Sequence, residues 1–206
     1  LHFDPARTRT LLGCGAAAAV AAAFNAPIAG ALFALEVVVG HYALSAFAPI
    51  VLAAVAATSV SRAWYGDFPA FVIPNYEQVG GVLEFPAFIL LGLVCAATAI
   101  LLIVGSETIR GWSARIPGPV WTRPAWAGAA VGLVALWRPE VLGVGYEATD
   151  AALSGLFSFD VLVALGLAKL LCSVICLGLG YGTGVFSPAL FLGAVVGGAF
   201  GLGATG

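Results

Sequence analysis

Residues 178–193 read Gly178-Leu-Gly-Tyr-Gly-Thr-Gly-Val-Phe-Ser-Pro-Ala-Leu-Phe-Leu-Gly193. Glycines at alternate positions from 178 to 184 disfavour a helix, because glycine loses more backbone freedom on ordering than any other residue. An apolar segment resumes at Val185, and Pro188 lies near its first turn, where proline is best tolerated. The pattern predicts that one helix ends at the glycines and that another begins directly after them.

The composition around this break is that of a membrane protein. Of the 206 residues, 62% are hydrophobic and 9% are charged, and the mean hydropathy is +1.08. A soluble globular domain has about 25% charged and about 45 to 50% apolar residues. The composition therefore excludes a soluble domain, a disordered chain, a collagen and a small disulfide-stapled scaffold. We expect an all-α integral membrane protein that crosses the bilayer several times.

The apolar segments differ in length, and several are interrupted. A helix needs about 20 apolar residues to span a bilayer, whereas segments of about 10 to 14 residues suggest partial crossings. Backbone that is not helical at membrane depth is tolerated only around a cavity or within protein, so broken helices indicate a transport path. The break at Asn25-Ala26-Pro27 separates two segments that we expect to be too short to cross alone. The segments are Leu11–Phe24, Pro27–Val39, Ala43–Val60, Phe85–Val104, Ala125–Trp137, Val161–Leu179 and Val185–Leu202.

The helix expected after the glycines has the chemistry of an anion site. Its first N–H groups have no intrahelical acceptor, and the helix dipole adds about half a positive charge at that end. Glycines allow close approach, and the absence of Lys or Arg from residues 178–193 leaves binding weak enough for the ion to leave. The alternative is a glycine-rich break that serves only helix packing.

Three stretches of the sequence resemble the CLC family of chloride channels and transporters. Gly184-Val-Phe-Ser-Pro-Ala-Leu190 matches the family's GxFxPxL signature. The stretch from Gly15 to Glu36, which contains AAAFNAPIAGALFALE, resembles a second family segment. Pro139-Glu-Val-Leu-Gly-Val-Gly-Tyr-Glu147 is similar to a third stretch that is common in bacterial members. The matches stand in the family's order and cover nearly the whole chain.

The resemblance implies a fold, a partner and a site. It implies that residues 1–206 are the central fragment of a CLC-type membrane domain, a bundle of tilted, short and broken helices with inverted repeats, in a homodimer. The backbone amides of Val185 and Phe186 would face the anion, with Gly182, Gly184 and Pro188 in the anion-loop motif. The family's serine loop and gate glutamate would precede this chain, and its pore tyrosine would follow it. We expect chloride or a similar small anion to cross a bacterial inner membrane.

Glu36 is the only carboxylate inside an apolar segment, which makes it a functional candidate. Proton-coupled CLC exchangers commonly have two adjacent glutamates here, and this sequence has Val37 at the second position. Valine binds no proton, so the resemblance favours a chloride channel over the alternative, a proton-coupled antiporter. For Glu36 itself we favour pairing with helix-end or loop donors over a proton relay.

Other chemistry finds little support in the sequence. No basic run indicates a nucleic-acid partner, since the net charge is −2. His2 and His41 are isolated, and the four cysteines lack zinc spacing, so we expect no metal, no cofactor and no enzyme activity. A membrane-embedded enzyme would need a cluster of titrating groups, and a structural scaffold would leave the break at 178–188 unexplained.

Two further predictions concern single positions. Lys169 lies within an apolar segment, where it could extend to the membrane surface, pair with a partner, or add positive potential near the pore. Ile28, Leu32, Leu35 and Val39 recur at helical spacing. We expect this stripe, on the segment that the resemblance places at the subunit contact, to face the second subunit.

Overall fold

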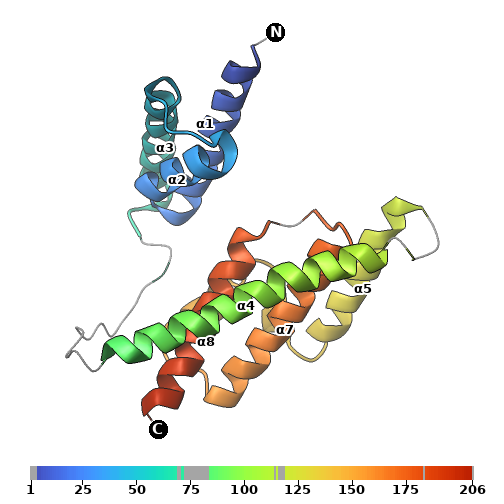
Figure 1. Cartoon of the computed structure of the whole chain (residues 1–206). Coiled ribbons are helices and arrows are strands. Elements are labelled where there is room, and N and C mark those ends of the chain that lie inside the picture. The colour runs from blue at the N-terminus through green and yellow to red at the C-terminus, as the bar shows by residue number, and fades with distance from the viewer. Residues whose placement is uncertain are drawn as a thin grey trace. The chain divides into compact units, whose positions relative to one another are not determined.

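The computed structural model describes residues 4–68, 71, 84–113, 115, 119–182 and 184–205, and in this part of the chain every regular element is a helix. The helices form two compact units, residues Leu1–Ala70 (unit 1) and Phe71–Gly206 (unit 2) (Figure 1). The all-α prediction is confirmed. The elements are α1 (Pro5–Phe24), α2 (Pro27–Phe33), η1 (Ala34–Val39), α3 (Leu44–Tyr65), α4 (Glu84–Ser113), η2 (Val120–Thr122), α5 (Arg123–Ala135), η3 (Pro139–Val141), α6 (Tyr146–Leu153), α7 (Phe159–Gly178) and α8 (Phe186–Thr205).

Four helices of the described residues are long and apolar enough to cross a membrane: α3, α4, α7 and α8. The longest, α4, has 30 residues and therefore extends about 45 Å. A hydrocarbon core is about 30 Å thick, so α4 continues beyond the expected span into its polar end, where Arg110 pairs with Glu107 at 3.4 Å. The chain is an integral membrane protein with several spans.

Unit 1 is an alanine-packed group in which α1 lies against α3 and α2 (Figure 1). The break at Asn25-Ala26-Pro27 lets α2 fold back along α1. A Cβ atom on Gly30 would lie 2.7 Å from the Ala17 carbonyl oxygen and 2.9 Å from the Ala21 backbone nitrogen. Only glycine fits at this distance, so the small residues of α1 and α2 permit backbone contact. The core members are Ala17, Ala21, Ala31, Ala34, Leu35, Val39, Ala46, Ile50 and Ala54.

The first helix is longer than its apolar segment suggests. Helix α1 begins at Pro5 and has 20 residues, so it extends about 30 Å. Helix α1 is nevertheless not among the described helices that are both long and apolar enough to cross a membrane, so its extra length does not contradict the expectation that the segment ending at Phe24 does not cross alone. The residues from Thr8 to Thr10 are helical but polar, so a boundary drawn from hydropathy does not include the first turns of the helix.

The predicted subunit-facing stripe does not form one face. Residues 34–39 are π-helical, and the Gly40 N–H donates to the Leu35 carbonyl at 2.8 Å. This wider turn alters the helical spacing on which the stripe depends. Leu35 and Val39 lie in the core of unit 1, whereas Ile28 is 76% exposed. The assignment of Leu35 and Val39 to a subunit contact is therefore wrong, and Ile28 and Leu32 keep that prediction.

Unit 2 is a bundle in which α4, α7 and α8 lie side by side (Figure 1). Helix α5 packs on α7, and the short α6 packs on α8. The largest buried side chain is Phe191 of α8, which is fully buried. The core thus joins the start of α8 to α7 and to the segment before α6. Its members are Val141, Ala148, Ala152, Leu162, Leu165, Ala168, Cys172, Phe191 and Val195.

Candidate anion site at the start of α8

Helix α7 ends at Gly178 with a regular stop signal, as the glycine pattern predicts. The Tyr181 N–H donates to the Cys176 carbonyl at 2.9 Å, and the Gly180 N–H donates to the Leu177 carbonyl at 3.3 Å. Gly180 has φ +74°, the left-handed conformation that this pair of bonds requires. The chain is thereby turned off the α7 axis before the anion-loop motif.

Helix α8 begins at Phe186, one residue from the predicted boundary. The Val185 carbonyl accepts the first helical bond, from the Ala189 N–H at 3.1 Å, so Val185 occupies the N-cap position. Gly182, Gly184, Val185 and Phe186 are exposed in unit 2, and Thr183 lies outside the described residues. These residues of the motif therefore lie at the surface of the unit.

Pro188 is buried, whereas Gly184, Val185 and Phe186 before it are exposed. It is the third residue of α8, where its missing N–H removes no intrahelical bond. The first turn of α8 contains no acidic residue, so no carboxylate of this turn opposes the positive end of the helix dipole. The turn is anchored by an apolar ring and is compatible with an anion.

A loop before α6 contacts this first turn. Ser187 Oγ donates to the Val144 carbonyl at 3.4 Å. Gly143 and Gly145 have φ +64° and +79°, which explains why glycine stands at both positions of the third family-like stretch. This contact was not among the sequence predictions, although both residues lie in the quoted motifs.

Lys169 is buried in unit 2, with 4% of its surface exposed. Its Nζ donates to the carbonyls of Val141 and Gly143 at 2.8 and 2.9 Å. It also lies 4.9 Å from the centroid of the Phe191 ring. Of the three alternatives for this side chain, the structure excludes extension to the membrane surface and shows pairing with carbonyls.

Tyr146 follows the same loop and opens α6. Its ring lies 5.5 Å from that of Phe71. Burial raises the pKa of the Tyr146 hydroxyl above its ordinary value, so this phenol is neutral at physiological pH and adds no negative charge beside the loop.

Glu36 lies in unit 1, within the π-helical turn, and its side chain is exposed there. Val37 is exposed as well, at 64%. π-helical turns are rare and occur frequently at functional sites. The predicted pairing of Glu36 with helix-end donors stays a prediction, as does the proton relay.

A polar network at the break between α1 and α2 was not predicted from the sequence. Asn25 Nδ2 donates to Asp67 Oδ1 at 2.9 Å and to the Phe68 carbonyl at 3.1 Å. Arg62 Nε donates to Asn25 Oδ1 at 2.7 Å and lies 3.1 Å from Asp67 Oδ1. Asn25 itself has φ +53°. An Asn before a helix-starting proline was the available signal; its partners lie about forty residues away in sequence.

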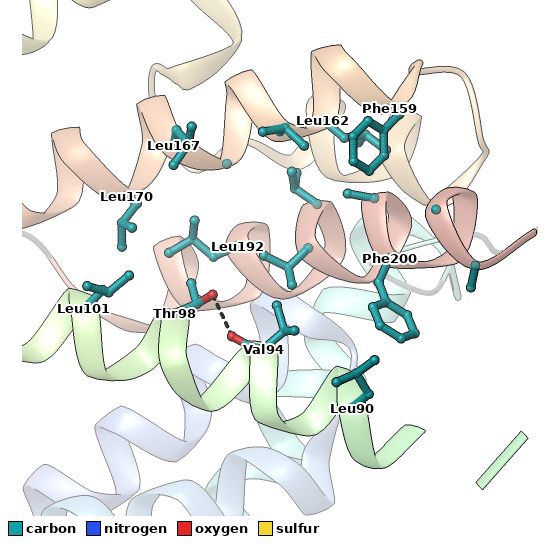
Figure 2. Close-up of a pocket in the computed structure, with 17 residues that line it drawn as sticks. Leu90, Val94, Thr98, Leu101, Phe159, Leu162, Leu167, Leu170, Leu192 and Phe200 are labelled. Atoms are coloured by element: carbon teal, nitrogen blue, oxygen red, sulfur yellow. Dashed lines mark hydrogen bonds between the residues drawn. The ribbon is translucent and has the colours of Figure 1, made fainter. Parts of the chain in front are cut away.

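Unit 2 also contains an apolar cavity of about 520 Å³ between α4, α7 and α8 (Figure 2). Leu90, Leu101, Phe159 and Phe200 point into it from the three helices (Figure 2). The Thr98 hydroxyl donates to the Val94 carbonyl at 2.9 Å and is satisfied within α4. The cavity has no positive group among these residues and does not suit an anion.

Several helices are apolar enough to cross a membrane, and one of them, α8, begins directly after a glycine loop. These features define the class as a multi-pass helical membrane protein with a broken-helix site. The sequence model for the voltage gated chloride channel family matches residues 1–205. The chain belongs to this CLC family.

Individual relatives include both channels and exchangers by name. A putative chloride channel protein ClcB-like from Ralstonia nicotianae is 33% identical over 95% of this chain and 45% of its own length. The H(+)/Cl(-) exchange transporter ClcA of Cronobacter sakazakii is 34% identical over 98% of this chain and 44% of its own. Chloride channel protein CLC-f of Arabidopsis thaliana is 30% identical over 95% of this chain and 27% of its own. The chain thus spans less than half the length of these relatives.

Proposed function

We propose that residues 1–206 are the central part of a CLC membrane domain through which chloride or a similar small anion crosses a membrane passively. The observation that supports this most is the start of α8, which follows a glycine loop and leaves Val185 and Phe186 exposed in unit 2. Membership of the family supports the anion as the transported species.

The chemistry of weak binding supports transport over storage. An anion at the N-cap of α8 would interact with backbone N–H groups and with the helix dipole. Residues 178–193 contain no Lys or Arg, so no full opposite charge of this segment holds the ion. Conduction requires binding that is favourable enough for entry and weak enough for release. We therefore assign the anion to the amides of Val185 and Phe186, within the motif formed by Gly182, Gly184 and Pro188.

The finer proposal is a channel without proton coupling, because Val37 stands where a second glutamate would bind protons. The alternative is a proton-coupled antiporter. Glu36 is exposed in a π-helical turn, and several relatives are named H(+)/Cl(-) exchange transporter. Both observations keep Glu36 as a candidate proton relay.

The wider setting follows from the relatives. Those compared above are named channels and an exchange transporter, which supports a role without catalysis. Two are bacterial, which supports the inner membrane of a bacterium. A homodimer with one pore per subunit follows from the family resemblance.

Chloride release from liposomes tests the proposal. The whole protein is reconstituted into chloride-loaded liposomes, and efflux is followed with a chloride electrode after addition of a potassium ionophore. We expect rapid efflux that protein-free liposomes do not show. Efflux no faster than in those liposomes would contradict anion transport.

A proton gradient separates the two mechanisms. With equal chloride on both sides, a channel gives no net chloride movement when only a proton gradient is applied. Chloride driven uphill would establish the antiporter instead. Loss of that pumping in Glu36→Gln, with the Glu36→Asp variant retaining it, would make Glu36 the proton relay.

A further inference from the structure

Lys169 is the single lysine of the sequence and lies near the middle of α7. A cation at such a position is costly unless it has partners. Its ammonium faces the interior of unit 2, where it donates to the carbonyls of residues 141 and 143. Within the described residues, no carboxylate lies in ion-pair range of this ammonium. The partners of this charge are therefore backbone carbonyls and an aromatic ring. The function proposed above assigns no role to Lys169.

The loop that Lys169 holds is fixed on its other side by α8. A Cβ atom on Gly145 would lie 2.5 Å from Cδ2 of Phe191, so the backbone at 145 lies directly on that ring. The same ring has the Lys169 ammonium 4.9 Å from its centroid, within range of a cation–π contact. Ser187, in the first turn of α8, donates to the Val144 carbonyl. Residues 142–145 thus lie between Lys169 and the start of α8.

We propose that Lys169 is a positioning residue that fixes residues 142–145 against the first turn of α8 and so sets the direction of the N–H groups that face the anion. The inference rests on the proposed function of that turn. A charged donor suits the task, because hydrogen bonds from an ammonium are about twice as strong as neutral ones. Removing it leaves two carbonyls without this donor, and buried carbonyls tolerate that poorly.

Positioning differs from a second role, in which the positive charge of Lys169 attracts the anion directly. Lys169→Met removes both the charge and the donors at similar size. Lys169→Arg keeps both. Gly145→Ala leaves the charge in place but displaces the loop, because its Cβ meets Phe191 and its φ of +79° disfavours alanine. Leu171→Met, at a position 52% exposed on the same helix, is the matched control.

The variants are compared in the whole protein by two measurements. The first is the chloride concentration that gives half-maximal flux in liposomes, together with the maximal flux. The second is amide hydrogen exchange of residues 142–148 in detergent, which needs no transport. We expect Lys169→Met and Gly145→Ala each to raise half-saturating chloride about tenfold, because both displace the loop that positions the N–H groups; tenfold corresponds to about 1.4 kcal/mol of binding free energy. Both should speed exchange in the loop, whereas Lys169→Arg and Leu171→Met should change neither quantity by more than about twofold.

Three outcomes overturn the inference. Unchanged exchange in Lys169→Met would show that Lys169 does not fix the loop. A raised half-saturating chloride in Lys169→Met but not in Gly145→Ala would assign the effect to charge alone. A rise in half-saturating chloride in Lys169→Arg equal to that in Lys169→Met would assign the effect to the size of the side chain. If Lys169→Met is not recovered as folded protein, Gly145→Ala and Lys169→Arg still decide. Faster loop exchange in a protein without chloride flux would support the positioning and contradict the proposed function instead.

Discussion

Two interruptions of helix are built from opposite chemistry. At Asn25-Ala26-Pro27 the break is two residues wide, because α1 ends at Phe24 and α2 begins at Pro27. A side-chain network and a glycine contact then hold α2 against α1. The second break is wider, because α7 ends at Gly178 and α8 begins at Phe186. The comparison teaches that an asparagine and a proline at the first break let the chain fold back on the preceding helix. The spaced glycines at the second break end one helix and leave the start of the next helix exposed.

The largest effect is expected where the first break depends on backbone contact. Gly30→Val places its Cβ within 2.7 Å of the Ala17 carbonyl oxygen, and backbone atoms cannot move aside cheaply. We expect a loss of about 3 kcal/mol or more from the free energy of unfolding, or no folded protein. Thermal unfolding in detergent measures it. Gly15→Val, where no atom lies within 4 Å of the Cβ, is the control, and equal stability of both variants would contradict this packing.

The next effect concerns the π-helical turn after the first break. Leu35 is fully buried in unit 1, so Leu35→Trp overfills the core and should cost about 2 to 3 kcal/mol. Ile28→Trp, at a position 76% exposed, should leave the stability of unit 1 unchanged within about 0.5 kcal/mol. Cross-linking of the folded protein provides a second measurement. Normal stability of Leu35→Trp with a lost dimer would restore the subunit-facing assignment of Leu35.

A smaller effect is expected at the second break. Gly180 ends α7 with φ +74°, and an L residue in the left-handed region costs about 1 to 2 kcal/mol. Gly180→Ala should therefore lower stability by that amount. Gly182→Ala, with no positive φ and no atom within 4 Å, should not change unfolding measurably. A Gly182→Ala variant that is less stable than Gly180→Ala would contradict the left-handed end of α7 at Gly180.

The smallest effect is expected from the polar network at the first break. Asn25→Ala removes the bonds to Asp67 and Phe68 and the bond from Arg62. These groups are exposed, so we expect a loss of about 1 kcal/mol. Asn25→Gly also removes the bonds but keeps the left-handed conformation easy, so the difference between the two variants measures the backbone part. Identical stabilities would mean that the φ of +53° carries no strain.

Much of the fold was predictable because its signals are local. The apolar segments, the stop at Gly178 and the restart next to Val185 follow from hydropathy, glycine and proline, which act within a few residues. The π-helical turn at residues 34–39 was not predictable from periodicity, since periodicity assumes the α-helical spacing that the turn abandons. The stripe was wrong because Leu35 and Val39 pack in the core of unit 1, whereas Ile28 is exposed.

The surroundings of the site were less predictable than its position. Val185 and Phe186 were identified from a motif, and the structure places them at a helix start, while their binding of an anion stays a prediction. The bonds from Lys169 to residues 141 and 143 span 28 and 26 positions of sequence. Nothing local to Lys169 indicates these carbonyls, because the partners are fixed by the packing of α7 on the segment before α6.

The location of a halide in the whole protein tests the central claim most directly. Crystals grown in bromide, or soaked in it, reveal bound bromide by its anomalous scattering. We predict an anomalous peak within hydrogen-bonding distance of the backbone nitrogens of Val185 and Phe186, at the start of α8. Well-occupied bromide elsewhere in the membrane domain, with none at these two amides, would contradict the account.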